Sequence, residues 1–62
     1  MVNDIVADLL TRIRNAHLRN QKETTVPSTK MVLAILQILK DEAYIEDFSE
    51  AEKVVTIRLK YI

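Results

Sequence analysis

The spacing of the apolar residues changes along this chain, and the change restricts the folds that it can adopt. Residues 4–19 carry apolar side chains at the intervals of an amphipathic helix, whereas residues 54–62 alternate between apolar and polar side chains. Alternation is the pattern of a strand with one buried face, here the face predicted to carry Val55, Ile57, Leu59 and Tyr61. A chain with both patterns needs a helical layer packed on a sheet, so the predicted class is α+β.

The first predicted helix has an apolar and a polar face. With successive residues about 100° apart, the apolar side chains fall in one arc, predicted to face the core: Ile5, Val6, Leu9, Leu10, Ile13 and Ala16. The opposite arc is polar, with Arg14 at its margin: Asp4, Asp8, Thr11, Arg12, Asn15 and Arg19. The spacing of Asp8 and Arg12 predicts an ion pair on this outer face.

A second helix is predicted over residues 29–43, after Pro27, with Ser28 capping its free amides. One apolar stripe is expected to face the sheet: Met31, Ile35, Ile38 and Leu39. Three further apolar residues make the apolar surface of the helix broader than that stripe. If they point outward, they form an apolar patch through which two copies of the chain can associate: Val32, Leu33 and Leu36.

The strands complete the predicted fold. Tyr44–Phe48 and Val54–Ile62 are expected to form a hairpin connected by residues 49–53, and residues 24–26 can add a third strand. The predicted order is helix, strand, helix, strand, strand. We therefore expect two helices on one face of a small two- or three-stranded sheet, with residues 1–62 forming one domain.

Several kinds of chemistry have no support in the sequence. The chain has no cysteine and one histidine, which argues against a disulfide, a thiol nucleophile and a structural zinc centre, and no cofactor is implied. His17 is interpreted as a residue on the flank of a helix. Ser28 has no histidine or acid at a recognisable spacing, and Glu46 and Asp47 are adjacent on a strand and so point to opposite faces. The chain is predicted not to be an enzyme.

The expected location is the cytoplasm. Asp4 and Asp8 fall where a secretory signal would be basic and then apolar. The chain also lacks an apolar stretch of the length, about 18 residues, that suggests a membrane span, so no membrane partner is expected.

Charge is segregated along the chain although its formal sum is zero. Residues 11–30 contain five basic residues and one acidic residue, whereas residues 41–52 contain six acidic residues and no basic one. A folded surface around the first helix and the turn after Pro27 can therefore be locally basic, as a protein that contacts phosphate requires.

Four blocks of the sequence together form a recognisable pattern: NDIVADLLTRIRNA at 3–16, VPSTK at 26–30, ILKDEAYIEDF at 38–48 and LKY at 59–61. In this order they strongly resemble the N-terminal half of the bacterial small-subunit ribosomal protein S8 family. The resemblance implies two helices on a three-stranded sheet. It also implies binding to the central domain of small-subunit ribosomal RNA, with neighbouring ribosomal proteins as further partners.

The resemblance assigns RNA-facing roles to residues of the first helix and of the turn: Asp4, Thr11, Arg12, Arg14, Asn15, Pro27, Ser28, Thr29 and Lys30. Arginine and lysine neutralise phosphates, hydroxyls and amides bond sugar or phosphate oxygens, and the amides at the start of a helix favour an anion. The family's C-terminal half carries the main RNA contact and is missing here, so weak binding is expected.

A second interpretation remains open. The chain contains no glycine, and Ala43 stands where the resembled family usually has one. Both features favour an excised or engineered folding unit that forms a homodimer through Val32, Leu33 and Leu36 and binds little RNA. In that case Arg12 and Arg14 are part of a solvated helix face.

Overall fold

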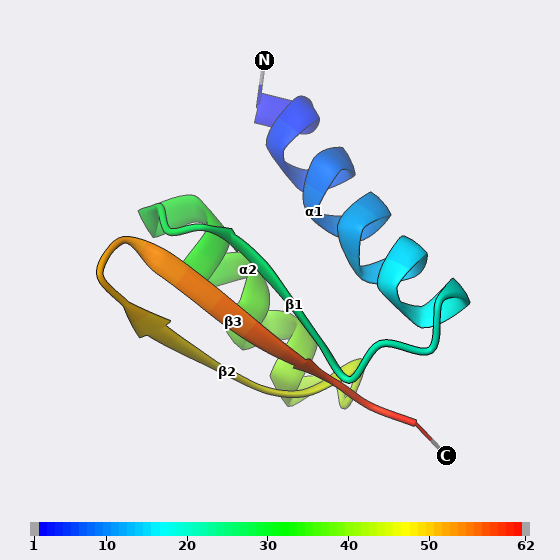
Figure 1. Ribbon diagram of the computed structural model, residues 1–62. Helices are drawn as coiled ribbons and strands as arrows, with labels where there is room; N and C mark the ends of the chain where they lie inside the picture. The colour runs from blue at the N-terminus through cyan, green and yellow to red at the C-terminus, as the bar shows by residue number, and fades with distance from the viewer. Residues whose placement is uncertain (1, 62) are drawn as a thin grey trace.

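A computed structural model describes residues 2–61, with side chains from Ile5 onward. The elements follow the order α1 (Val2–Leu18), β1 (Glu23–Pro27), α2 (Lys30–Asp41), β2 (Ile45–Ala51) and β3 (Val54–Leu59). The three strands form an antiparallel sheet in the order β1-β3-β2, and both helices pack on one of its faces (Figure 1). This arrangement confirms the predicted α+β class and the order of the elements.

β3 shows why the alternating pattern identified a strand. Val55, Ile57 and Leu59 are buried against the helices, whereas Thr56 and Arg58 lie on the opposite, uncovered face. The strand ends at Leu59, earlier than predicted, and Tyr61 is 46% exposed rather than part of the core face. Because β3 pairs on both sides, it is the central strand of the sheet.

α1 buries the middle of its predicted apolar arc. Leu9, Ile13 and Ala16 are buried, whereas Ile5 and Leu10 at the margins of the arc are 40% and 38% exposed. The margins are open because a helix on one side of a sheet covers only the centre of its apolar stripe. The prediction of a core role for Ile5 and Leu10 was therefore wrong.

α2 faces the core with a side that only partly matches the predicted one: of the predicted stripe, Ile35 and Leu39 pack against the core and Met31 and Ile38 do not. Val32 and Leu36 are core residues and Leu33 packs against them, whereas Met31 and Ile38 are 36% and 61% exposed. The predicted patch for self-association is wrong for this reason. Apolar residues surround so much of α2 that periodicity could not identify the buried side, which the packing on β2 and α1 determines.

α2 is shorter than the predicted 29–43 at both ends, and its N-cap is not the predicted residue. Thr29, not Ser28, is the N-cap, and its Oγ1 accepts a hydrogen bond of 3.1 Å from the amide of Val32. At the other end Ala43 has a φ of 62°, and the amide of Tyr44 donates to the carbonyl of Leu39 over 2.8 Å. This is a Schellman ending made without glycine.

The β2–β3 hairpin is tighter than expected. Its turn contains only Glu52 and Lys53, with φ values of 50° and 69°, rather than the predicted connection of residues 49–53. Positive φ at both turn residues is typical of a type I′ turn, whose twist matches that of the strands. Pro27 ends β1 at the edge of the sheet, where its missing N–H leaves no sheet partner unsatisfied.

Within residues 2–61, the helices are too short or too polar to span a lipid bilayer.

Candidate nucleic-acid interface

Arg12 connects the outer face of α1 to the edge of the sheet. Its Nε lies 3.0 Å from the Oδ2 of Asp8, which confirms the predicted ion pair, and its Nη1 donates to the carbonyl of Thr25 over 3.3 Å. Both side chains of the pair are largely exposed. The contact with Thr25 orients the guanidinium along β1 and leaves it open to solvent.

The turn between β1 and α2 is held by the β2–β3 hairpin. The amide of Ser28 donates to the carbonyl of Lys53 over 2.8 Å, and the hydroxyl of Ser28 donates to the carboxylate of Glu50. The hydroxyl of Thr29 is occupied as the N-cap of α2, and Lys30 is exposed. The turn is therefore a fixed element of the surface.

α1 and the turn meet across an open apolar groove of about 290 Å³. Ile5 and Asp8 line it from α1, and Pro27 and Thr29 line it from the turn. The fold therefore brings the two segments expected to face RNA to one side of the molecule, although a polar loop and β1 separate them in sequence. Arg12, which pairs with Asp8, lies beside this groove.

The other expected residues of α1 lie farther around the helix. Thr11, Arg14 and Asn15 are exposed. Because Arg12 and Arg14 are two residues apart, their side chains leave α1 about 200° apart around its axis. Arg14 is therefore on a different flank from Arg12. The side chain of Asp4 lies outside the described residues.

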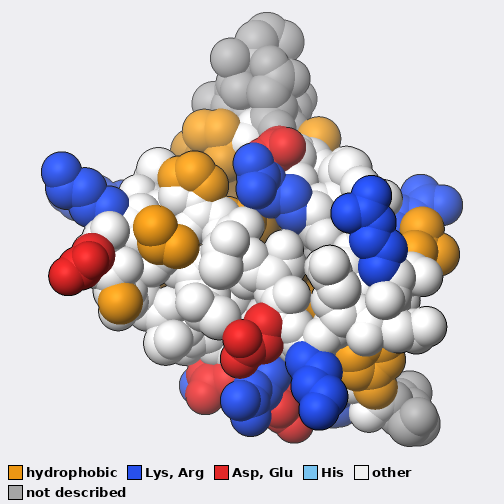
Figure 2. Space-filling view, viewed as in Figure 1, with side chains coloured by type: hydrophobic (Ala, Val, Ile, Leu, Met, Phe, Trp, Pro, Cys, Tyr) orange, Lys and Arg blue, Asp and Glu red, His pale blue; other side chains and the backbone are white. Residues whose placement is uncertain are grey.

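The uncovered sheet face has charges at one end and hydroxyls at its centre. Thr25, Thr56 and Ser49 are paired across the strands, and Figure 2 shows a central region without charged side chains. Next to it, Arg58 lies 3.6 Å from Glu23 and 3.9 Å from Glu46. Arg58 therefore lies between two carboxylates, so this end of the face has no excess of positive charge to attract phosphate.

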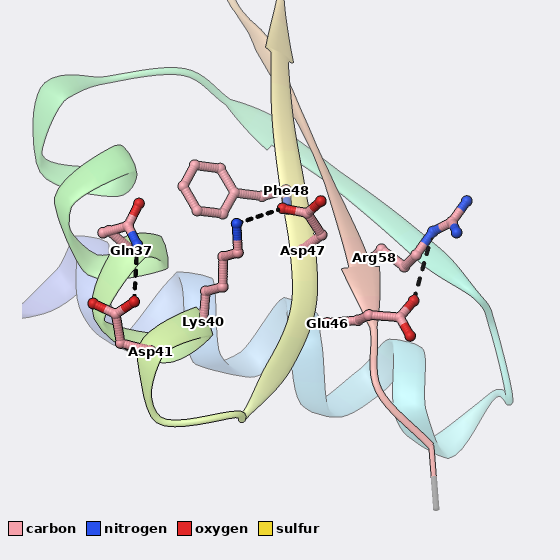
Figure 3. A network of polar contacts seen from close by, with 7 residues as sticks. All are labelled: Gln37, Lys40, Asp41, Glu46, Asp47, Phe48 and Arg58. Carbon is pink, nitrogen blue, oxygen red and sulfur yellow. Dashed lines mark hydrogen bonds and ion pairs between the residues drawn. The ribbon is translucent and has the colours of Figure 1, made fainter.

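Glu46 and Asp47 bind different partners (Figure 3), although the regular alternation assumed in the prediction is interrupted here, because the register with β3 shifts between Ile45 and Asp47. Glu46 faces Arg58, whereas Asp47 pairs with Lys40 of α2 over 3.1 Å. The hydrogen bond from the Phe48 amide, and then Lys40, hold the pKa of Asp47 below its usual value. The two carboxylates do not form a catalytic pair.

Sequence reasoning missed two residues at the turn, Glu50 and Lys53. Both come from the β2–β3 hairpin and contact Ser28, which lies more than twenty residues earlier in the chain. No local pattern connects positions so far apart. Only the pairing of β3 with both β1 and β2 brings them together.

Comparisons of the sequence with known proteins agree with one another. The family model described as ribosomal protein S8 matches residues 4–62. The chain is 54% identical over 61 residues to small ribosomal subunit protein uS8 of Oleidesulfovibrio alaskensis, covering 98% of this chain and 48% of the relative. The uS8 proteins of Desulfovibrio desulfuricans and Mesoplasma florum are each 50% identical, over 100% and 98% of this chain and 49% and 50% of their own lengths. The matched family is one of ribosomal proteins, which confirms that the chain is not an enzyme.

Proposed function

The chain belongs to the ribosomal protein S8 family, and on that premise we propose that it is an RNA-binding module of the small ribosomal subunit. The chain spans about half the length of the curated relatives it matches. In this proposal residues 1–62 act as one domain that corresponds to the N-terminal half of the family. Its place is the cytoplasmic ribosome, beside neighbouring ribosomal proteins.

The observation that carries the proposal is the juxtaposition of α1 with the turn at Pro27. Arg12 is oriented by Asp8 and by the carbonyl of Thr25, and Lys30 is exposed where α2 begins. Two cations on neighbouring elements suit the regular spacing of phosphates on a folded RNA. The molecule is neutral as a whole, so this local arrangement and not net charge has to attract RNA.

The proposed contact residues have different roles, and Arg14 acts from a different flank of α1 than Arg12. Arg12, Arg14 and Lys30 neutralise phosphates, and Thr11 and Asn15 bond sugar or phosphate oxygens. Thr29 acts by fixing the start of α2, because its hydroxyl is already a cap. Pro27 shapes the turn, the hydroxyl of Ser28 donates to a phosphate, and Asp4 completes the proposed set. These contacts amount to a weak binding site.

A titration of labelled central-domain ribosomal RNA with the protein tests this function. We expect Arg12→Ala and Lys30→Ala each to weaken binding several-fold and to reduce the slope of log K against log salt by about one, because each removes one phosphate contact. The control is Lys60→Ala, which removes the same charge after the end of β3. Equal affinities and slopes for all three variants and the unmodified chain would reject the proposal.

A further inference from the structure

We propose that Glu50 restrains RNA binding at the turn between β1 and α2. Its carboxylate accepts the hydrogen bond of the Ser28 hydroxyl and places a negative charge where a phosphate has to approach. This inference rests on the proposed function, because it concerns the same RNA-facing turn. The inference adds Glu50, a residue of β2, as a group that opposes the contact between the turn and an RNA phosphate.

The sheet register explains why Glu50 reaches the turn. Glu50 is directly opposite Val55 in the antiparallel β2–β3 pair. Residues opposite each other in such a pair project from the same face, and Val55 is buried on the face that the helices cover. Glu50 therefore projects toward the helical layer, at the end of the hairpin where the backbone of Lys53 binds Ser28.

The start of α2 is suited to the negative charge that Glu50 brings. The first turn of α2 contains no acidic residue of its own, although the free amides there favour an anion. Glu50 brings a carboxylate from another element to the half-buried Ser28, two residues before α2 begins. An RNA phosphate approaching the turn competes with Glu50 for the same hydroxyl and the same electrostatic environment.

The consequence is an energetic penalty on RNA binding at this turn. Ser28 must release Glu50 before its hydroxyl can donate to a phosphate. Lys30 and Lys53 attract the phosphate, but the carboxylate that is bonded to Ser28 repels it. The repulsion between exposed groups weakens as salt is added, because the screening length falls to about 8 Å at physiological ionic strength.

Variants that remove one negative charge separate the effect of Glu50 from the effect of the other acidic residues of the hairpin. Glu50→Gln removes the charge but keeps an acceptor for Ser28, and Glu50→Ala removes both. Glu52→Gln is the matched control. It makes the same charge change two residues along the chain, but the Ser28 hydroxyl donates to Glu50 and not to Glu52. Binding to labelled central-domain ribosomal RNA is measured at about 50 and about 200 mM salt, where electrostatic contributions differ strongly.

We expect Glu50→Gln to bind RNA roughly three- to tenfold more tightly at the lower salt, with a smaller gain at the higher salt. The affinity of Glu50→Ala for RNA should increase at least as much, and that of Glu52→Gln clearly less. Thermal unfolding of each variant shows whether the fold is retained. Because Glu50 is replaced in two ways, a folding defect in one variant leaves the other to test the proposal.

Two results would overturn the inference in distinguishable ways. If Lys30→Ala weakens binding but Glu50→Gln has no effect or matches Glu52→Gln, the role of Glu50 is rejected and the RNA-facing turn stands. If Lys30→Ala and Arg12→Ala leave both the affinity and the salt slope unchanged, the proposed function fails, and the role of Glu50 fails with it.

Discussion

Ala43 holds a backbone conformation that glycine adopts more readily. Its φ of 62° lies in the left-handed region, where the Cβ of any other residue crowds the backbone. Asn20 ends α1 in the same way, with a φ of 56°, and asparagine tolerates that region better than alanine does. Among these two helix ends, the one at Ala43 therefore carries the greater strain.

We expect Ala43→Gly to raise the free energy of unfolding by about 1 kcal/mol, because it removes the strain of a left-handed alanine. Urea unfolding followed by circular dichroism measures the change. The control is Ala34→Gly, in the exposed middle of α2, which should lower stability by about 1 kcal/mol. A loss of stability in both variants would contradict this account of the helix end.

At the scale of the element, α2 shows how packing selects one side of a helix. Leu36 is fully buried and Ile38 is 61% exposed, although they are two residues apart in the same helix. We expect Leu36→Ala to lower the free energy of unfolding by about 3 kcal/mol, because it leaves a cavity in the core. Ile38→Ala should change it by less than about 0.5 kcal/mol. A larger loss for Ile38→Ala than for Leu36→Ala would mean that α2 packs through the other stripe.

At the scale of the whole molecule, the residues that follow β3 connect the end of α1 to the sheet. The ring of Tyr61 packs edge-on against His17 with centroids 5.2 Å apart, and its hydroxyl donates to the carbonyl of Gln21. The Nε2 of His17 is also 3.3 Å from the carbonyl oxygen of Lys60. These contacts agree with the interpretation of His17 as a helix-flank residue and give it a tertiary partner.

We expect Tyr61→Phe to lower the free energy of unfolding by about 1 kcal/mol, the usual value of one hydrogen bond. Amide hydrogen exchange should accelerate most near the end of α1, because the lost bond holds the loop that follows it. Tyr44→Phe is the control, because Tyr44 is 48% exposed and Tyr61 is 46% exposed. Similar effects of the two variants would show that the contact with Gln21 contributes nothing.

The sequence by itself determined the class of fold, the order of the elements, the core positions of β3 and the ion pair of Asp8 with Arg12. These features depend on residues close together in the chain, and periodicity and spacing report such features directly. The RNA-facing residues came from a family resemblance and remain a proposal.

Only the tertiary structure decided which side of α2 is buried, which residue caps it, and which groups surround Ser28. The apolar surface of α2 is too broad for its period to identify one face, so contacts with other elements made the choice. Glu50 and Lys53 reach Ser28 through strand pairing between distant segments. A turn that reads as basic in sequence thereby acquires a carboxylate in the folded protein, because register and not sequence distance sets which charges meet.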